Sequence, residues 1–294
     1  MSKRVNPGLL PAALAFVIWG VFPLYFHPLH QVSAFQIIGH RIVWSCLFVL
    51  AWIAVRRELS TLRTTLADLG LVWRLAVTAT LITINWLVYV WGVINGHVVE
   101  TSLGYFIGPL VNVLLGVILL KEKLTVAQWV SVALAATGVT YLTITTGHLP
   151  WISLALAFSF ATYGLMRKVV KVEALPGLAT ETILLAPFAT AYLVWCELHG
   201  TGALGRDGAA IDALLVGSGP LTAIALFLYA YGTRLLPYST VGLLQYITPT
   251  LQFACGVFAF HEPFERTRAI GFTIIWVALA IYAGEGLRLA RAAS

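Results

Sequence analysis

Long apolar stretches follow one another along almost the whole chain, with short polar segments between them. The stretches are continuously apolar, as in 114–120 and 184–188, and lack the period-two alternation that is typical of a membrane β-barrel strand. A helix needs about 20 residues to cross the hydrocarbon core of a bilayer. Ten segments reach or approach this length, and we predict them as membrane-spanning helices: 8–26, 33–55, 70–94, 100–120, 126–145, 149–166, 176–197, 212–233, 239–260 and 268–286.

The composition supports a membrane environment. Hydrophobic residues make up 60% of the 294 residues and charged residues only 10%, whereas charged residues are about 25% of a typical soluble domain. A backbone in lipid must satisfy its hydrogen bonds internally, and a helix does so. We therefore predict an all-α membrane protein that forms a single transmembrane domain over 1–294.

Lysine and arginine residues are shared unevenly between the two predicted sides of the membrane. Cytoplasmic loops are enriched in these residues. With the N-terminus inside, 14 of the 18 fall in inner segments and three in outer segments, while Arg41 lies within a span. This split predicts that both termini and segment 56–69 are cytoplasmic and that segment 198–211 is external. No nucleic-acid partner is expected, because the sequence has no basic patch with interleaved aromatic residues.

The two halves of the sequence resemble each other when one is shifted by 140 residues. Residues 81–142 then align without a gap. The matched pairs include Tyr89 with Tyr229, Gly92 with Gly232, Pro109 with Pro249, Gly116 with Gly256, and Glu122 with Glu262. Each half has five predicted spans, so the second half enters the membrane in the opposite sense. We predict two inverted five-helix repeats, about 5–145 and 148–287, an architecture that recurs in transporters.

Several chemical functions lack their sequence signals. The chain has no Gly-x-x-x-x-Gly-Lys-Ser/Thr loop, no His-Glu-x-x-His and no Gly-x-Ser-x-Gly. Its three cysteines, Cys46, Cys196 and Cys255, lack metal-ligand spacing and are expected to be small hydrophobic residues. We therefore predict no enzyme activity, no cofactor and no metal site. Transport would then draw on a gradient or be passive.

Short motifs spread over nearly the whole chain resemble one transporter family. They are Ile18-Trp19-Gly20, His40-Arg41, Asn85-Trp86-Leu87-Val88-Tyr89, Asn95-Gly96-His97, Ser102-Leu103-Gly104-Tyr105-Phe106 and Gln245-Tyr246-Ile247-Thr248-Pro249-Thr250. In this order and spacing they resemble the RarD branch of the EamA family, within the drug/metabolite transporter superfamily. The resemblance implies a ten-helix carrier of the bacterial inner membrane that moves small metabolites. Small multidrug exporters of this superfamily carry an acid in their first helix. Neither 8–26 nor 149–166 contains one, which argues against a proton–drug exchange centred there.

Polar and aromatic side chains in three spans share helical faces that are expected to line a common cavity. The fourth and ninth spans show this pattern at i, i+4, i+7 and i+11, and the third span shows a shorter version. The alternative is helix packing, because small residues and amides also join helices in membranes. The predicted substrate-binding residues are Trp19, His40, Arg41, Trp44, Asn85, Trp86, Tyr89, Tyr105, Asn112, Gln245, Tyr246 and Gln252.

Arg41 lies about 12 Å inside the second span, where an unpaired guanidinium is costly. It is expected either to pair with Glu100 or Glu181, or to bind a substrate carboxylate through two parallel hydrogen bonds. The adjacent His40 is expected to be a packed neutral side chain or a proton-coupling group.

Two matched pairs of residues are candidates for moving parts. Pro109 and Pro249 lie near the middle of their spans, where each removes a backbone hydrogen bond. They are either hinges or fixed kinks. Glu122 and Glu262 end their helices at opposite membrane faces, as solvated loop charges or as gating salt bridges.

The sequence as a whole predicts a secondary-type transporter, an exporter or permease. It would move small metabolites, such as amino acids or amphipathic compounds, by alternating access. Its partners would be a small-molecule substrate and membrane lipid, and a monomer is compatible with the sequence. A channel, a lipid flippase and an intramembrane enzyme are the alternatives. A carrier shows counterflow whereas a channel does not, and an enzyme would form product in detergent.

Overall fold

The computed structural model describes residues 7–121, 124–170, 172–236 and 244–292. All the secondary structure in these residues is helical. The elements are α1 (Leu9–Gly20), α2 (Phe22–Phe26), a 3-10 turn η1 (His27–Leu29), α3 (Ala34–Val55), α4 (Leu59–Ala67), α5 (Leu69–Ile94), α6 (Val98–Leu120), α7 (Val126–Thr146), α8 (Trp151–Val169), α9 (Ala174–Leu198), α10 (Ala209–Arg234), α12 (Ile247–Ala254), a π-helical turn η2 (Cys255–Ala259) and α13 (Arg266–Ala292).

Seven of these helices are long and apolar enough to cross a membrane, namely α3, α5, α6, α7, α9, α10 and α13. An eighth span results if α1 and the segment Phe22–Leu29 are counted together, since they meet at a 45° bend. The predicted first span is therefore broken. The predicted ninth span, 239–260, begins in residues that lie outside the described ones, and its described part is α12 followed by η2.

Polar residues at the ends of the apolar stretches begin several of the helices. The Ser33 hydroxyl accepts a hydrogen bond from the Gln36 amide at the start of α3, and the Asp68 carboxylate accepts one from the Leu71 amide at the start of α5. Thr125 forms a reciprocal capping box with the third residue of α7. Such caps satisfy amides that have no partner within the helix. The short connections seen in the sequence are thus helix caps as well as turns.

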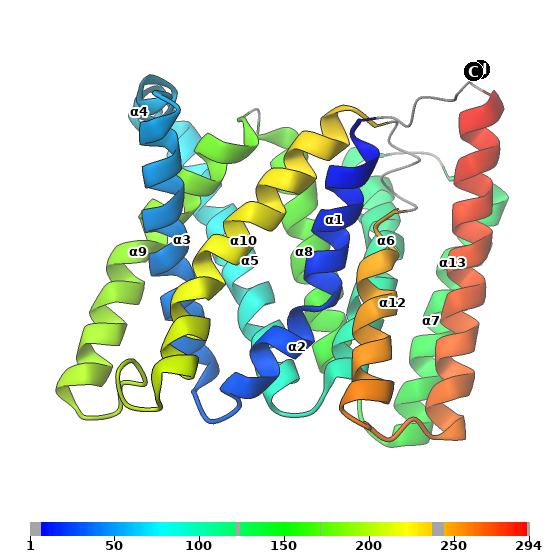
Figure 1. Cartoon of the computed structure of the whole chain (residues 1–294). Coiled ribbons are helices and arrows are strands. Elements are labelled where there is room, and N and C mark those ends of the chain that lie inside the picture. The colour runs from blue at the N-terminus through cyan, green and yellow to red at the C-terminus, as the bar shows by residue number, and fades with distance from the viewer. Residues whose placement is uncertain (1–6, 122–123, 171, 237–243, 293–294) are drawn as a thin grey trace, which may run out of the picture.

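Consecutive long helices from α3 onward run in opposite directions between the two ends of the bundle (Figure 1). The start of α1 and the end of α13 lie at the same end, together with the short helix α4. The 198–209 connection and the turn between α5 and α6 lie at the opposite end. Which of the two ends faces the cytoplasm stays a prediction from the charge pattern.

The helix contacts follow a reciprocal pattern. Helix α1 packs on α10 and α12, while α8, which the predicted repeat matches to α1, packs on α5 and α6. In the same way α3 contacts α10 and α9 contacts α5. Three further contacts, α3 with α9, α6 with α12 and α7 with α13, each join two helices that the predicted repeat matches.

Candidate functional site

Arg41 lies among aromatic side chains that belong to the largest apolar cluster of the described residues. Its side chain is 2% exposed. The guanidinium carbon is 4.2 Å from the ring centre of Trp86 on α5 and 5.5 and 5.6 Å from those of Phe22 and Phe26 on α2. Nε donates a hydrogen bond of 2.8 Å to the Thr222 hydroxyl on α10. Three helices and α3 itself therefore fix the position of this one charge.

No carboxylate neutralises Arg41 among the described residues. Glu181 pairs instead with Arg167, with 3.6 Å between Oε1 and Nη1. Glu100 forms no ion pair with Arg41 in the part of the chain that the structure describes, so the predicted pairing of Arg41 with either acid is wrong. Nη1 of Arg41 is buried and has no hydrogen-bond partner among the described residues. The guanidinium thus has a donor that no described residue uses.

Gln252 on α12 supplies a second polar group beside the aromatic side chains around Arg41. Its Nε2 donates to the Trp19 carbonyl at 3.1 Å and approaches the Tyr89 hydroxyl at 3.4 Å. Pro23 explains why this carbonyl is free, because a proline four residues on has no N–H to donate to it. A carbonyl cannot donate, so the amide nitrogen must face Trp19 and the oxygen must face away. That Oε1 is buried without a partner among the described residues.

The side-chain amide of Asn85 on α5 forms hydrogen bonds within the protein through both its nitrogen and its oxygen. Its Nδ2 donates to the Leu156 carbonyl and the Ser159 hydroxyl on α8, at 3.1 and 3.0 Å, and its Oδ1 accepts from the Tyr105 hydroxyl on α6 at 3.1 Å. The Tyr105 ring packs 5.9 Å from that of Tyr89. Asn85 therefore joins three helices and orients Tyr105, and it has little capacity left to bind a substrate.

Three other predicted residues are on α1 and α3. Trp19 packs its ring 5.4 Å from Tyr229 on α10. Trp44 lies against Gly219 of α10, where a Cβ would collide with it, so this tryptophan marks a close approach of α3 and α10. His40 is buried, and its Nε2 has no partner within the described residues.

The residues around the guanidinium and Gln252 are together called the Arg41 cluster: Phe22, Phe26, Arg41, Trp86, Tyr89, Tyr105, Thr222 and Gln252.

Seven of the twelve predicted substrate-binding residues are not members of the Arg41 cluster: Trp19, His40, Trp44 and Asn85, described above, and Asn112, Gln245 and Tyr246. Asn112 is exposed on α6, so the expected face of the fourth span does not turn toward the cluster along its whole length. Gln245 is half-buried in the turn before α12. Tyr246 packs in a different apolar core between α6, α7 and α13. Nothing in the sequence pattern separates these three from Gln252.

The two predicted hinge prolines occupy unlike places. Pro109 is buried inside α6, where it removes a backbone hydrogen bond. Pro249 is the third residue of α12, and amides in the first helical turn have no partner within the helix. The segment before α12 lies partly outside the described residues, so the expected interruption of a helix at Pro249 in mid-span stays a prediction.

Glu262 joins the loop before α13 to the start of α6 at one end of the bundle. It is 9% exposed, and its Oε1 and Oε2 accept hydrogen bonds from the Val98 and Val99 amides at 2.6 and 2.8 Å. These are the first amides of α6, so the carboxylate caps that helix from the loop before α13. Burial raises the pKa of Glu262, while the two amides act in the opposite direction. The expectation of a solvated loop charge is wrong for Glu262, and the matched Glu122 lies outside the described residues.

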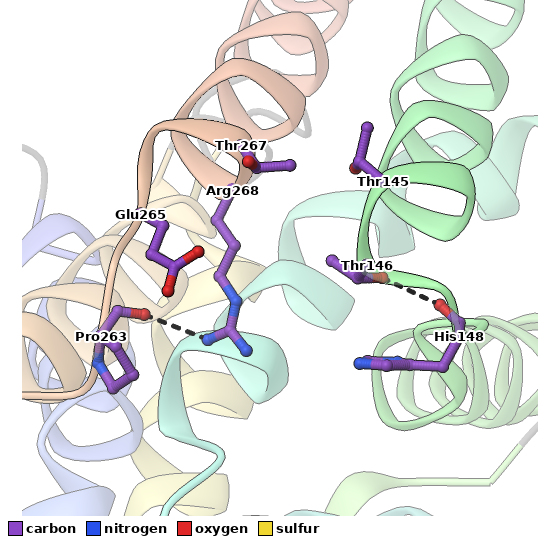
Figure 2. Close-up of a pocket in the computed structure, with 7 residues that line it drawn as sticks. All are labelled: Thr145, Thr146, His148, Pro263, Glu265, Thr267 and Arg268. Atoms are coloured by element: carbon purple, nitrogen blue, oxygen red, sulfur yellow. Dashed lines mark hydrogen bonds between the residues drawn. The ribbon is translucent and has the colours of Figure 1, made fainter.

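A polar pocket of about 310 Å³ lies at the same end, between the end of α7 and the start of α13 (Figure 2). Arg268 points into it and donates to the Pro263 carbonyl at 3.2 Å. Its lining residues are Thr145, Thr146, His148, Pro263, Glu265, Thr267 and Arg268. None of them belongs to the Arg41 cluster, so this is a separate feature of the rim.

Comparison with known proteins identifies the family. The EamA-like transporter family model matches residues 6–144. Protein RarD of Escherichia coli strain K12 is 40% identical over 293 residues, which cover 100% of this chain and 99% of that protein. The chain is a RarD-type member of the EamA family. Protein RarD of Streptomyces exfoliatus is 43% identical over 99% of this chain and 92% of its own length. An uncharacterized transporter of Vibrio cholerae is 39% identical over 99% of this chain and 97% of its own length.

Membership of the EamA family makes this protein a multi-pass membrane transporter of the drug/metabolite group. A solved crystal structure shares the fold, with a TM-score of 0.58 and 20% identity over 94% of this chain and 97% of that one. The sequence predicts five members of the Arg41 cluster, namely Arg41, Trp86, Tyr89, Tyr105 and Gln252, but not the partners of Arg41 on α2 and α10. The i, i+4 spacing of Phe22 and Phe26 was a usable signal for one shared face. Thr222 gave no such signal.

Proposed function

We propose that this protein is a secondary transporter that binds the carboxylate of a small metabolite at Arg41 and moves it by alternating access. The observation that carries the proposal is a buried guanidinium with an unused donor and no acidic partner among the described residues. A charge at this depth needs an anion or water to offset the loss of hydration. A substrate carboxylate supplies the anion and can accept two parallel hydrogen bonds.

The rest of the Arg41 cluster suits a small amphipathic metabolite. The rings of Trp86, Phe22 and Tyr89 offer apolar contact, and the free Oε1 of Gln252 can accept a hydrogen bond from an ammonium or hydroxyl group. An amino acid carries a carboxylate, an ammonium group and an apolar or polar side chain. Amino acids are therefore the first class of substrate to test.

We further propose ten spans in two inverted repeats, with both termini in the cytoplasm. The reciprocal helix contacts support this topology, because exchanging the two halves maps each main contact onto another one or onto itself. The 14-to-3 distribution of basic residues supports the orientation. Two similar halves that exchange conformations would convert an outward-open cavity into an inward-open one.

Two measurements in sequence test the transport proposal. Thermal-shift assays of the purified protein against a metabolite library would select compounds that stabilise it. Counterflow of the selected compound in proteoliposomes would then distinguish a carrier from a channel. Binding by carboxylates together with counterflow would support the proposal. Stabilisation by cationic compounds alone would contradict the assigned role of Arg41.

A further inference from the structure

Glu181 is a second buried ionisable group, and the substrate site does not use it. The residue is on α9 and is 2% exposed. Its Oε1 accepts a hydrogen bond of 2.6 Å from the Thr78 hydroxyl on α5 and lies 3.6 Å from Nη1 of Arg167 on α8. Three helices therefore meet at one carboxylate. Ionisable residues within membrane spans are costly and often mark ion or proton pathways.

Glu181 occupies the position that corresponds to Arg41 in the other half. Arg41 is the eighth residue of α3, and Glu181 is the eighth residue of α9. The two helices start at opposite ends of the bundle (Figure 1). The matched positions thus carry opposite charges, and each lies eight residues into a helix that starts at the opposite end of the bundle from the other. Arg41 lies among ring faces, whereas Glu181 has a hydroxyl and a cation as neighbours.

Arg167 connects this carboxylate to the end of the bundle where α8 finishes and α9 begins. Its side chain is 18% exposed, whereas that of Glu181 is 3% exposed. The guanidinium lies over Gly177, one turn before Glu181 on the same helical face, and a Cβ at Gly177 would collide with it. The missing side chain at 177 is therefore what lets Arg167 reach the acid from the rim.

Few groups around Glu181 determine whether its carboxyl group is ionised or protonated. Burial disfavours the carboxylate, while a nearby cation and a hydrogen-bond donor favour it. The other polar or ionisable neighbours in the described residues are Tyr163 of α8, which interacts with Glu181, and Cys46 of α3, which contacts the next residue, Thr182. Helices α4 and α10 contribute apolar side chains to this part of the α9 surface: Leu62, Leu66, Ala223 and Leu226.

We propose that Glu181 is a proton-binding site, reached past Arg167 from the end of the bundle that the proposed topology places in the cytoplasm, and that it couples transport to a proton gradient. A proton from water forms an O–H bond on the Glu181 carboxylate, and one negative charge disappears. The pair with Arg167 changes from neutral to singly positive. Arg167 then loses its counter-charge and can turn toward water at the rim. This inference rests on the proposed transport function.

Infrared difference spectroscopy of the reconstituted protein tests the proton site without any substrate. In the wild type we expect a carboxylic acid C=O band that grows as the pH is lowered and is missing in Glu181→Gln. In Gly177→Ala the new methyl group displaces Arg167, so the carboxylate loses its cation and should take up its proton at a pH about one unit or more higher. Gly164→Ala on α8 is the matched control, since a Cβ there meets nothing within 4 Å. Its titration midpoint should equal that of the wild type.

Two results would overturn the proton site, namely a wild-type difference spectrum equal to that of Glu181→Gln, or an unshifted midpoint in Gly177→Ala.

Transport is measured separately, with a mixture of radiolabelled amino acids in proteoliposomes. Counterflow at equal pH tests the proposed function. A pH gradient should drive accumulation in the wild type but not in Glu181→Gln. If the wild type shows counterflow but no accumulation driven by the pH gradient, the proton coupling is refuted and the transport function stands. If the Glu181 band titrates but no counterflow is seen, both the transport of these solutes and its coupling to protons are refuted.

Discussion

Arg41 is surrounded by ring faces rather than carboxylates. A cation–π contact contributes about 2 kcal/mol when it is desolvated, whereas removing an ion from water costs several kcal/mol even in a relaxed protein. The rings at 4.2 to 5.6 Å and the Thr222 hydroxyl therefore offset much of this cost but leave Nη1 unpartnered. A carboxylate that arrives with the substrate would supply what the chain does not.

The separate surroundings of Arg41 and Glu181 predict that their substitutions act independently. Arg41→Ala and Glu181→Gln should change the free energy of unfolding additively, within about 0.5 kcal/mol, because the two groups share no partner. Chemical unfolding of both single variants and the double variant in detergent measures this. Recovery of stability in the double variant would mean that the two residues pair after all.

The hydrogen bonds of Asn85 predict a structural role for this residue. Asn85→Ala should lower the free energy of unfolding by about 1 to 2 kcal/mol, a usual range for a hydrogen bond between membrane helices. Thr80→Ala is the matched control on α5, since Thr80 is exposed and bonds only to its own helix. Thermal unfolding in detergent compares the two. Equal transitions for Asn85→Ala and the wild type would contradict the assigned role.

The depth of Arg41 could be predicted from the sequence because the apolar stretches fix where α3 begins. Its partners could not, since Phe22, Trp86 and Thr222 come from three other helices far apart in the chain. Gln252 was found by its polar position in a span. Its free oxygen depends on Pro23, and the sequence does not reveal that contact between α1 and α12.

At the scale of elements, the first turn of α6 is held from two directions. Glu262 accepts hydrogen bonds from the amides of Val98 and Val99. The turn η2 approaches the same residues so closely that a Cβ at Gly256 would lie 2.8 Å from the Val99 side chain. These contacts join the second half of the chain to the first at one end, which the proposed topology makes external. They are expected to open when the cavity faces outward.

Removing the Glu262 carboxylate should therefore expose the interior from outside. The reporter is Cys255, which is 8% exposed at the start of η2, with Cys46 and Cys196 replaced by Ala. Glu262→Ala should speed labelling of Cys255 by an impermeant maleimide about tenfold or more, because each charge-assisted hydrogen bond contributes about 1.5 to 3 kcal/mol. Glu265→Ala in the same loop is the control and should label like the parent protein. Equal rates in both variants would show that Glu262 does not close this end.

The positions of most helices follow from the length of the apolar stretches, but their breaks do not. Pro23 disrupts the first predicted span near Val21, and a continuous apolar run hides this bend. No residue pattern in segment 239–260 marks the start of α12 at Ile247. Segment 56–69 was expected to be a loop and contains α4, whose nine residues are too few to change the span count.

At the scale of the whole molecule, the reciprocal contacts support the proposed repeat, in which each half is the counterpart of the other. The sequence predicts this repeat because Pro, Gly, Tyr and Glu recur in one register. It does not predict the contacts between the halves, since they depend on which helical faces pack together. In the proposed repeat, Arg41 and Glu181 occupy matched positions that carry opposite charges.

Cysteine labelling tests the proposed orientation. In a cysteine-free background, Asp207→Cys should react with an impermeant maleimide in intact spheroplasts, and Ser60→Cys should react only after lysis. Both residues are exposed, in the 198–209 connection and on α4. Reaction of Ser60→Cys from outside would show that the proposed orientation is reversed, so that the end assigned to the cytoplasm is external and the other end is cytoplasmic.

Counterflow in proteoliposomes tests the central claim most directly, namely that Arg41 binds the carboxylate of a transported metabolite. The wild type should exchange a labelled carboxylate compound selected by thermal shift. Arg41→Lys should lose most of this exchange, because an ammonium cannot present two parallel donors. Arg206→Ala, at an exposed arginine of the 198–209 connection, should exchange like the wild type. Wild-type counterflow in a folded Arg41→Lys protein, or no counterflow of any carboxylate compound by the wild type, would contradict the account.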